Sequence, residues 1–535
     1  MVRMHRILRR FRIPAGALAG LLLLAACNST STNETARMPD ATPSATTATP
    51  LPAATEPATH NAVPALVDDV EHRAFNYFLE LGNPQNGLLP DRWPTPSFSS
   101  IAAVGFGLTS YGVGVERGWI TRDQGIERTL ATLRFFDSAA QGDAAVGMSG
   151  NHGFFYHFLD MKTGARFETN ELSTVDTALL MGGVLFSQSY FHRDDPREAE
   201  IRALAERLYR RVDWTWPRPR APKIAMGWTP EHGMHGYDWS GYNEAQLVYI
   251  LALGSPTHPV ARDAYDAWTA TYDKSWGSFE GQEHLSFPPL FGHQYSQVWL
   301  DLRGVQDDYM RRRGIDYFEN SRRATLSQRS YAIANPLQWK GYDADVWGLT
   351  ACDGPVDATV DYNGKPRLFR TYSARGAGLE YTFDDGTIAP TAAIGSIAFA
   401  PEVVVPAINA MHARYGKQIY GQYGFLDAFN PSFDFKDVKL HHGKIVDGVW
   451  VDGDYLGIDQ GPIVLMIENH RSGLVWDVMR RNPHILRGLK RAGFRGGWLD
   501  AVGDGAVDIN RAASSTTPAQ STPAAVRSMP AAAAH

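Results

Sequence analysis

The sequence predicts an all-α fold, an (α/α)6 toroid (a barrel of helix hairpins) with short β insertions. Apolar residues recur with the helical period in about ten segments from Val63 onward. Clusters of Gly, Asn and Pro separate these segments, as expected for loops between paired helices. Alternation typical of strands is short and confined to residues 357–385 and 437–452. Ten to twelve helices in antiparallel pairs fit a closed toroid.

The helical segments follow one another through the whole body of the chain. In the first, Val70, Ala74 and Phe78 lie on one helical face. The other segments are predicted at residues 121–138, 171–191, 197–212, 244–254, 258–272, 295–312, 318–333, 401–415 and 460–480. The breakers between them include Gly82-Asn83-Pro84, Pro217-Arg218-Pro219, Gly254-Ser255-Pro256, Phe287-Pro288-Pro289 and Asn335-Pro336.

Other architectures fit this pattern less well. A TIM barrel needs eight strands, which the alternation pattern does not supply. No repeat of 20–50 residues typical of a solenoid is visible. A two-domain helical protein stays open as an alternative.

The first 27 residues predict a lipoprotein signal peptide. Five arginines (Arg3, Arg6, Arg9, Arg10 and Arg12) precede an apolar run from Ile13 to Ala26 that is short for a membrane span. The run ends in Leu24-Ala25-Ala26-Cys27, which resembles the site where a bacterial signal peptidase leaves a diacylated cysteine. We therefore expect lipidation at Cys27 and a location on the periplasmic side of a membrane, with the outer membrane favoured. The alternative is an ordinary secretory signal.

The flanks of the body have a different composition from the body itself. Residues 28–62 and 511–535 are rich in Ser, Thr, Ala and Pro, which predicts a disordered tether and tail around a globular domain at 63–510. If Cys27 carries lipid, Cys352 has no partner for an intramolecular disulfide. Loss of the five signal arginines takes the net charge from −6 to −11, which argues against nucleic acid as a partner. We expect a monomer.

The loops are unusually rich in aromatic residues. Among them are Trp239, Tyr242, Tyr295, Trp347 and Phe425, which stand near Gly, Asp and Asn. An aromatic face packs against the C–H groups of a pyranose, and polar neighbours bind its hydroxyls. The pattern favours a carbohydrate-binding cleft, with core packing as the alternative for each ring.

Ten segments in one order resemble the bacterial glycoamylase-like domain, grouped as glycoside hydrolase family 144, which is known for endo-β-1,2-glucanases. They lie at residues 86–92, 153–160, 171–177, 241–245, 253–259, 290–296, 316–322, 347–355, 423–431 and 458–462. The resemblance implies an (α/α)6 fold, hydrolysis of β-1,2-glucan to short sophoro-oligosaccharides, inversion at the anomeric carbon, and neither a metal nor another cofactor. It does not separate endo action, exo action and transglycosylation.

A glycosidase needs a protonated carboxyl group for the leaving oxygen and a carboxylate for water or for the anomeric carbon. Glu244 is the candidate acid: it precedes the apolar run 247–253 at a helix start, where burial must outweigh the helix dipole to keep it protonated. Asp427, in a loop rich in Gly, Asn and aromatics, is the candidate base. Asp459 is its near-equal rival, since Asp-Gln-Gly-Pro also resembles a helix start.

Further polar residues are candidates for binding sugar hydroxyls. Asp176 stands three residues after Ser173 in a capping-box pattern, so its alternative is a helix cap. His293, Arg322 and Asp353 are weaker candidates, because a lone His is more often structural.

The sequence lacks the motifs of other hydrolase classes. Gly-x-Ser-x-Gly, His-Glu-x-x-His and a Walker loop are all absent. Two rivals remain: a hydrolase or lyase acting on another polysaccharide, and a non-catalytic periplasmic glucan-binding lipoprotein. Binding alone needs few carboxylates in the site, whereas catalysis needs a pair.

Overall fold

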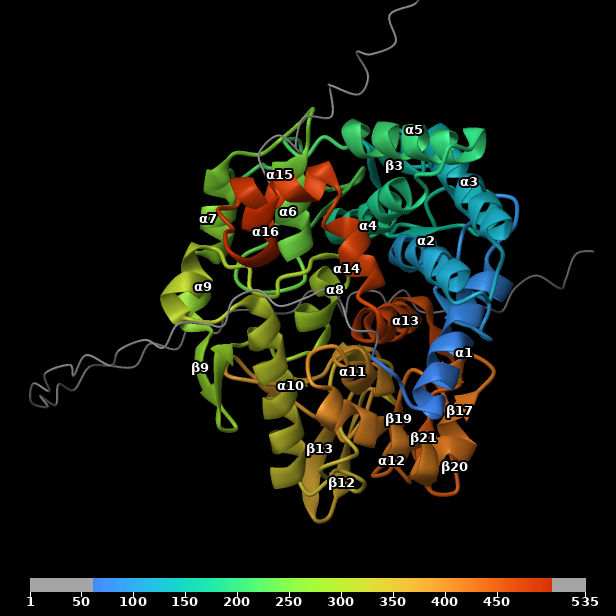
Figure 1. Cartoon of the computed structure of the whole chain (residues 1–535). Helices are drawn as coiled ribbons and strands as arrows, with labels where there is room; N and C mark the ends of the chain where they lie inside the picture. Colours follow the sequence, from blue (N-terminus) through green and yellow to red (C-terminus); the bar gives the residue numbers. More distant parts are fainter. Residues whose placement is uncertain (1–60, 503–535) are drawn as a thin grey trace, which may run out of the picture.

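The computed structural model describes residues 61–502, and Figure 1 shows their arrangement. The predicted signal peptide with Cys27, nearly all of the tether, the tail and residues 503–510 of the predicted domain lie outside the described residues. Within residues 61–502, no helix is both long enough and apolar enough to cross a membrane.

Helices form the bulk of the structure. They are α1 (Ala65–Leu81), α2 (Ile101–Glu116), α3 (Arg122–Ser138), α4 (Thr174–Tyr190), α5 (Pro196–Arg211), α6 (Gln246–Gly254), α7 (Arg262–Thr269), α8 (Phe291–Trp299), α9 (Asp308–Arg313), α10 (Tyr317–Ala334), α11 (Pro390–Ile394), α12 (Pro401–Ile419), α13 (Gly457–Arg471), α14 (Leu474–Met479), α15 (Pro483–Arg491) and α16 (Gly497–Ala501). The predicted helix-rich class is confirmed.

Two kinds of helix alternate along the chain. α2, α4, α6, α8, α11 and α13 are buried on nearly every side. α1, α3, α5, α7, α10 and α12, by contrast, bury one face and leave another in solvent. α2 packs between α4 and α13, and α13 also packs on α11. In Figure 1, α13 and α8 lie near the centre of the molecule, with α5, α1 and α12 towards its rim.

The tightest contact between inner helices rests on two glycines. A Cβ on Gly105 of α2 would lie 2.2 Å from the carbonyl oxygen of Leu179, and a Cβ on Gly183 of α4 would lie 2.1 Å from the carbonyl oxygen of Gly105. Real Cβ atoms do not approach a backbone so closely. The two helices therefore meet backbone to backbone, where no other residue fits.

Several predicted boundaries were wrong. The segment 295–312 is two helices, α8 and α9, and 460–480 is divided at Gly473, whose positive φ of 71° ends the helical path. α2 and α15 were not predicted at all. Every residue of α2 from Ile101 to Gly114 is buried, so its sequence is apolar on all faces and shows no helical period.

Short strands occupy many loops. The two predicted regions contain the hairpins β12 (Ala358–Tyr362) with β13 (Lys365–Phe369), and β20 (Lys444–Val446) with β21 (Val449–Val451). Their confinement to these regions was wrong, because a further hairpin joins β9 (Trp276–Phe279) to β10 (Gln282–Leu285). The remaining strands are β1 (Arg92–Trp93), β2 (Ser99–Ser100), β3 (Gly150–Asn151), β4 (Phe154–Phe155), β5 (Phe158–Leu159), β6 (Leu172–Ser173), β7 (Gly227–Thr229), β8 (Gly233–Met234), β11 (Ala351–Cys352), β14 (Ser373–Ala374), β15 (Gly376–Ala377), β16 (Thr382–Phe383), β17 (Tyr420–Gly421), β18 (Gly424–Phe425), β19 (Phe429–Asn430) and β22 (Tyr455–Leu456).

Three of these strands lead directly into inner helices. β2 runs into α2, β6 into α4 and β22 into α13, and they pair with β5, β7 and β1 respectively. The backbone at the start of each of these helices is thereby fixed by a second chain segment. This end of the inner helices is where the carboxylates described next are found.

Candidate active site

Acidic residues gather at the N-terminal ends of the inner helices. Asp176 is the third residue of α4 and Asp459 the third residue of α13, while Glu244 stands two residues before α6. Asp427 lies between β18 and β19, and Asp353 follows β11. Electrostatic interactions link Glu244 to Asp176, and Asp427 to both Asp459 and Asp353. Tyr295 of α8 interacts with both Glu244 and Asp459, so the carboxylates form one cluster.

Glu244 has the environment expected of a general acid. Its Oε2 is buried without a hydrogen-bond partner. Its pKa is raised to about 7, chiefly by burial; a hydrogen bond from its own backbone N–H opposes the rise and the charge of Asp176 adds to it. The Ser296 hydroxyl donates to the Glu244 carbonyl oxygen at 2.7 Å and ties this turn to α8. The direction of the pKa shift is the one that the sequence argument required of a working acid.

Asp427 and Asp459 form a carboxyl pair. Oδ2 of Asp427 accepts a 2.8 Å hydrogen bond from the Asp353 backbone N–H, whereas Oδ1 of Asp427 and Oδ2 of Asp459 are buried without a hydrogen-bond partner. Burial raises the pKa of Asp427 well above its usual range, and the charge of Asp459 adds to the rise. The pKa of Asp459 is raised to about 7, chiefly by burial, and its interaction with Asp427 opposes the rise. Because each carboxyl shifts the pKa of the other, the two titrate as a pair.

Arg92 forms ion pairs with two of the acidic residues of the cluster. Its guanidinium lies 2.6 Å from Oδ2 of Asp353 and 3.7 Å from Oδ2 of Asp454. β1, which carries Arg92, pairs with β22 directly before α13, and this pairing brings the N-terminal segment to the site. Arg92 thus supplies positive charge that a group of acidic residues needs in order to remain ionised.

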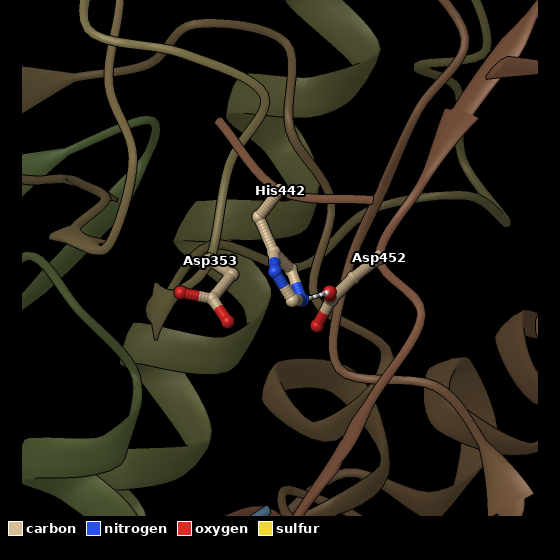
Figure 2. A group of neighbouring side chains, drawn as sticks. All are labelled: Asp353, His442 and Asp452. Atoms are coloured by element: carbon tan, nitrogen blue, oxygen red, sulfur yellow. Dashed lines mark ion pairs between the residues drawn. The ribbon is translucent and has the colours of Figure 1, made fainter. Parts of the chain in front are cut away.

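His442 is a second cation in the cluster. Its Nε2 lies 2.6 Å from Oδ1 of Asp452 and 3.3 Å from Oδ2 of Asp454, and the interactions with these carboxylates raise its pKa to about 10. Figure 2 shows its ring between Asp353 and Asp452. One ligand atom from each of these three residues lies within 4.8 Å of the others, a spacing that suits a metal ion. A metal there would have to displace the proton of His442 and compete with Arg92 for Asp353, so the contacts describe an ion network.

His157 links the α4 end of the cluster to a surface loop. Nδ1 of His157 lies 2.9 Å from Glu171, and Nε2 lies 3.5 Å from Asp176. Although burial lowers it, the pKa of His157 is raised to about 9 by the charges of Asp176 and Glu171. Ser173 caps α4, since its Oγ accepts from the Asp176 backbone N–H, and the Asp176 carboxylate accepts in turn from the Ser173 hydroxyl.

The predicted aromatic binding residues lie in different environments, some near the carboxylate cluster and others in the core. Tyr295 contacts the carboxylate cluster, as described above. Trp239 is largely buried and donates its indole N–H to Thr174 at the start of α4, and Tyr242 packs against Tyr272 and Tyr317. Trp347 and Phe425 have almost no exposed surface. For these two rings, the core-packing alternative describes the structure, because a buried face cannot stack on a sugar.

Two predicted polar partners serve the scaffold. His293 is buried in α8 beside Tyr242 and His284, and burial lowers its pKa to about 3, which keeps the ring neutral. Arg322 lies on α10, where it pairs with Glu402 and donates to the Phe399 carbonyl oxygen. No described contact joins either residue to the carboxylate cluster, so the structure gives no support to a binding role for them.

Sequence reasoning assigned no role to several members of the cluster. These are Asp91, Arg92, His157, Tyr372, His442, Asp452 and Asp454. The first three stand inside segments that carried the family resemblance. The sequence Val451-Asp452-Gly453-Asp454, two acids directly after an apolar strand, was the available signal for two of the others.

The chain is similar to a family of proteins and to several solved structures. The Glycoamylase family model, which describes glucoamylase-type proteins, matches residues 236–483. An endo-β-1,2-glucanase from Chitinophaga pinensis, solved with sophorotriose and glucose, is 30% identical, with 81% of this chain and 99% of that chain covered and a TM-score of 0.68. A β-1,2-glucanase from Parabacteroides distasonis is 26% identical, with 80% and 60% covered and a TM-score of 0.67.

A curated protein of Parabacteroides distasonis is named exo β-1,2-glucooligosaccharide sophorohydrolase (non-reducing end). It is 27% identical over 458 residues, which cover 80% of this chain but 57% of that protein. The chain thus spans little more than half the length of this curated relative. With 30% identity over almost the whole Chitinophaga enzyme, this chain belongs to the glycoamylase-like family that includes the endo-β-1,2-glucanases of glycoside hydrolase family 144.

Proposed function

We propose that the protein is a glycoside hydrolase that cleaves β-1,2-glucan to short sophoro-oligosaccharides by an inverting acid/base mechanism. The observation that carries the proposal is the state of Glu244, whose buried, unpartnered Oε2 belongs to a carboxyl group with a pKa of about 7. Such a group is protonated in a large fraction of molecules near neutral pH and can still release its proton. It lies in one cluster with a second pair of carboxyls, Asp427 and Asp459, whose charges act on each other.

In this mechanism Glu244 protonates the glycosidic oxygen of the leaving chain. Asp427, as the carboxylate, removes a proton from the attacking water, and Asp459 carries the remaining proton of the pair. Inversion needs room for water between acid and base, so we expect their carboxyl groups to be about 6.5–9.5 Å apart and not the ~5–5.5 Å of a retaining pair. A base acting through a chain of waters could lie further away.

We also propose that the six inner and six outer helices close into an (α/α)6 toroid with the cluster at its mouth. The alternation of fully buried and half-buried helices supports this arrangement, as does the contact of α2 with both α4 and α13. The carboxylates stand where several inner helices begin. Each helix start contributes partial positive charge to a site crowded with acids.

The size of the cluster favours an enzyme over a non-catalytic glucan-binding lipoprotein. A binding site needs few ionisable groups, because hydroxyls are recognised well by neutral donors and acceptors. Here Asp353, Asp427, Asp452, Asp454 and Asp459 are all buried within one network. Burial of so many acids has an electrostatic cost that a purely binding function does not require.

For localisation, we propose a monomer tethered by a lipid at Cys27 to the periplasmic face of a membrane, with the outer membrane favoured. The Leu24-Ala25-Ala26-Cys27 sequence after five arginines supports the anchor. Asn28 follows the cysteine instead of the aspartate that retains many lipoproteins in the inner membrane.

The proposal is tested by incubating the purified wild-type protein and Glu244→Gln with linear β-1,2-, β-1,3-, β-1,4- and α-1,4-glucans. We expect sophoro-oligosaccharides from the β-1,2-glucan, little product from the others, and no comparable product from the variant. Cyclic β-1,2-glucan separates endo from exo action, because a ring offers no chain end. Starch as the best substrate, or equal activity of the variant, would contradict the proposal.

A further inference from the structure

Resting on the proposed function, we propose that Arg375 is a positioning residue for the base: its guanidinium polarises the Cys352–Asp353 peptide bond, whose N–H binds Asp427. The described hydrogen bonds of Arg375 do not include Asp427 itself, although the two charges attract. One peptide unit connects the two side chains. No sequence motif drew attention to it.

Burial and ion pairing hold the Arg375 side chain in one position. Its side chain has no exposed surface, and its guanidinium forms a two-pronged ion pair with Asp385, with Nε and NH2 each 2.8 Å from a carboxylate oxygen. Asp385 is equally buried. A buried bidentate pair holds the plane of the guanidinium in one orientation and so determines where its remaining N–H groups point.

The remaining donors point at two backbone carbonyls, one of which is on the strand β11 that leads to the site. NH1 of Arg375 donates to the Cys352 carbonyl oxygen at 2.7 Å, and NH2 donates to the Arg370 carbonyl oxygen at 2.9 Å. Pairing of β11 with β14 sets Cys352 opposite Ser373, two residues before Arg375. Gly354 shows how closely the chain wraps the guanidinium, because a Cβ there would lie 2.1 Å from NH2 of Arg375.

The same peptide unit reaches the base from its other end. The Cys352 carbonyl accepts from Arg375, and the N–H of that peptide, on Asp353, donates to Oδ2 of Asp427 at 2.8 Å. A cation at the carbonyl draws electron density from the amide and strengthens its N–H as a donor, since hydrogen bonds in series polarise one another. The ionised form of Asp427 gains most, because a carboxylate is the stronger acceptor.

Arg375 favours the ionised form of Asp427, whereas the other groups around Asp427 favour its protonated form. The charged and titratable groups that face Asp427 are Asp353, Asp452 and Asp459, together with Tyr372, Cys352 and Arg375. All but Arg375 favour the protonated form of Asp427, either by negative charge or by excluding water. Arg375, opposite Asp385, is the buried cation on this side of the base.

The test is the pH dependence of kcat/KM on linear β-1,2-glucan, where the acidic limb reports ionisation of the base. Arg375→Gln should move that limb to higher pH by roughly half to one unit, the free energy of one hydrogen bond. Asp385→Asn, which leaves the guanidinium uncompensated, should move it to lower pH. Arg375→Lys keeps the charge, so its limb should stay near the wild-type position even if kcat falls. Thermal unfolding confirms that each variant is folded.

Shifts of opposite sign in Arg375→Gln and Asp385→Asn support the inference, because a merely structural role predicts loss of activity without opposed shifts. If the acidic limb of the pH profile moves in neither variant, or moves in the same direction in both, the inference is overturned. If Arg375→Gln does not fold, the sign of the Asp385→Asn shift decides. Wild-type protein without activity on β-1,2-glucan overturns the proposed function and this inference with it, whereas an active wild type with unmoved limbs overturns the inference alone.

Discussion

Asp427 and Asp459 lie close enough for each carboxyl to shift the pKa of the other, with 2% and 3% of their surfaces exposed. They come from separate elements, a loop after β18 and the first turn of α13. The sequence argument named Asp427 as the base and Asp459 as its near-equal rival. The structure brings the two rivals together, so ionisation of one carboxyl disfavours ionisation of the other.

Substitution separates the two members of the pair. Asp427→Asn should lower kcat by at least ~10²-fold, the lower scale for losing a general base, with KM nearly unchanged. Asp459→Asn should cost less, because an amide can still donate to Asp427. Initial rates on linear β-1,2-glucan check this. An active Asp427→Asn beside an inactive Asp459→Asn would move the base to Asp459.

Glu244→Gln should lower turnover by at least ~10²-fold and leave substrate affinity nearly intact. In the wild type, activity should fall as pH rises through about 7, where Glu244 loses its proton. Glu402→Gln, a substitution of the same kind at a surface ion pair with Arg322, serves as the control and should stay active. Comparable losses of turnover in both variants would contradict the assignment of Glu244 as the general acid.

Glu244 should also affect stability with a definite sign. Its pKa is about 7 in the folded protein, against an ordinary value of 4.5 for a glutamate, so the folded state binds more protons between these values. Stability from this group is therefore lost as pH rises from 4.5 to 7. Unfolding temperatures of Glu244→Gln should exceed those of wild type increasingly across that window. A difference in unfolding temperature that does not change with pH would show that burial does not destabilise the ionised form of Glu244.

The stereochemistry of the product tests the proposed mechanism as a whole. An inverting enzyme acting on a β-linked chain releases the α-anomer first. NMR spectra recorded before mutarotation should show that anomer growing ahead of the β form. A first-formed β-anomer would mean retention, and a carboxylate of the cluster would then have to act as the nucleophile.

His157 should stabilise the fold in its charged form. Its pKa is raised from 6.5 to about 9, so its contribution is fully present below pH 6.5 and is lost as pH rises through 9. His157→Gln should cost on the order of 2 kcal/mol at pH 6, with the deficit shrinking towards pH 9. Denaturant unfolding at a series of pH values measures this, with the exposed His152→Gln as control. A deficit independent of pH would indicate packing instead of charge.

Cys27→Ala should release the protein from the membrane fraction or leave an uncleaved precursor, with glucanase activity of the released domain retained. Fractionation and the mass of the mature chain give the readout. The control is the wild-type domain exported with an ordinary secretory signal. Cys352→Ala does not serve as a control, because Cys352 is buried and its substitution would also disturb the core. Unchanged membrane association of the variant would remove the lipid anchor.

Helical period predicted α1, α3 and α5, each of which buries one face, and missed α2, which is buried on all faces; α4, α6 and α13 are buried almost as completely and were still predicted. Asp427 became a candidate because the aromatic loop around it offers no structural explanation for an acid, whereas Glu244 and Asp459 could also be read as acids at a helix start. Asp452 and His442 were missed because they become functional only when β21 and the loop before β20 bring them together with Asp353. Contacts of that kind join residues distant in the chain, and no local pattern encodes them.

The meeting of α2 and α4 at Gly105 and Gly183 has a consequence for how this protein can change. A methyl group at either glycine would force the helix axes apart, and Asp176 at the start of α4 would move with its helix. Random mutagenesis should therefore recover almost no active variants at these two positions. Selection for longer or branched substrates should yield its substitutions in the loops that carry Asp353, Asp427 and His442, so adaptation would reshape the rim of the molecule while its helical interior stays unchanged.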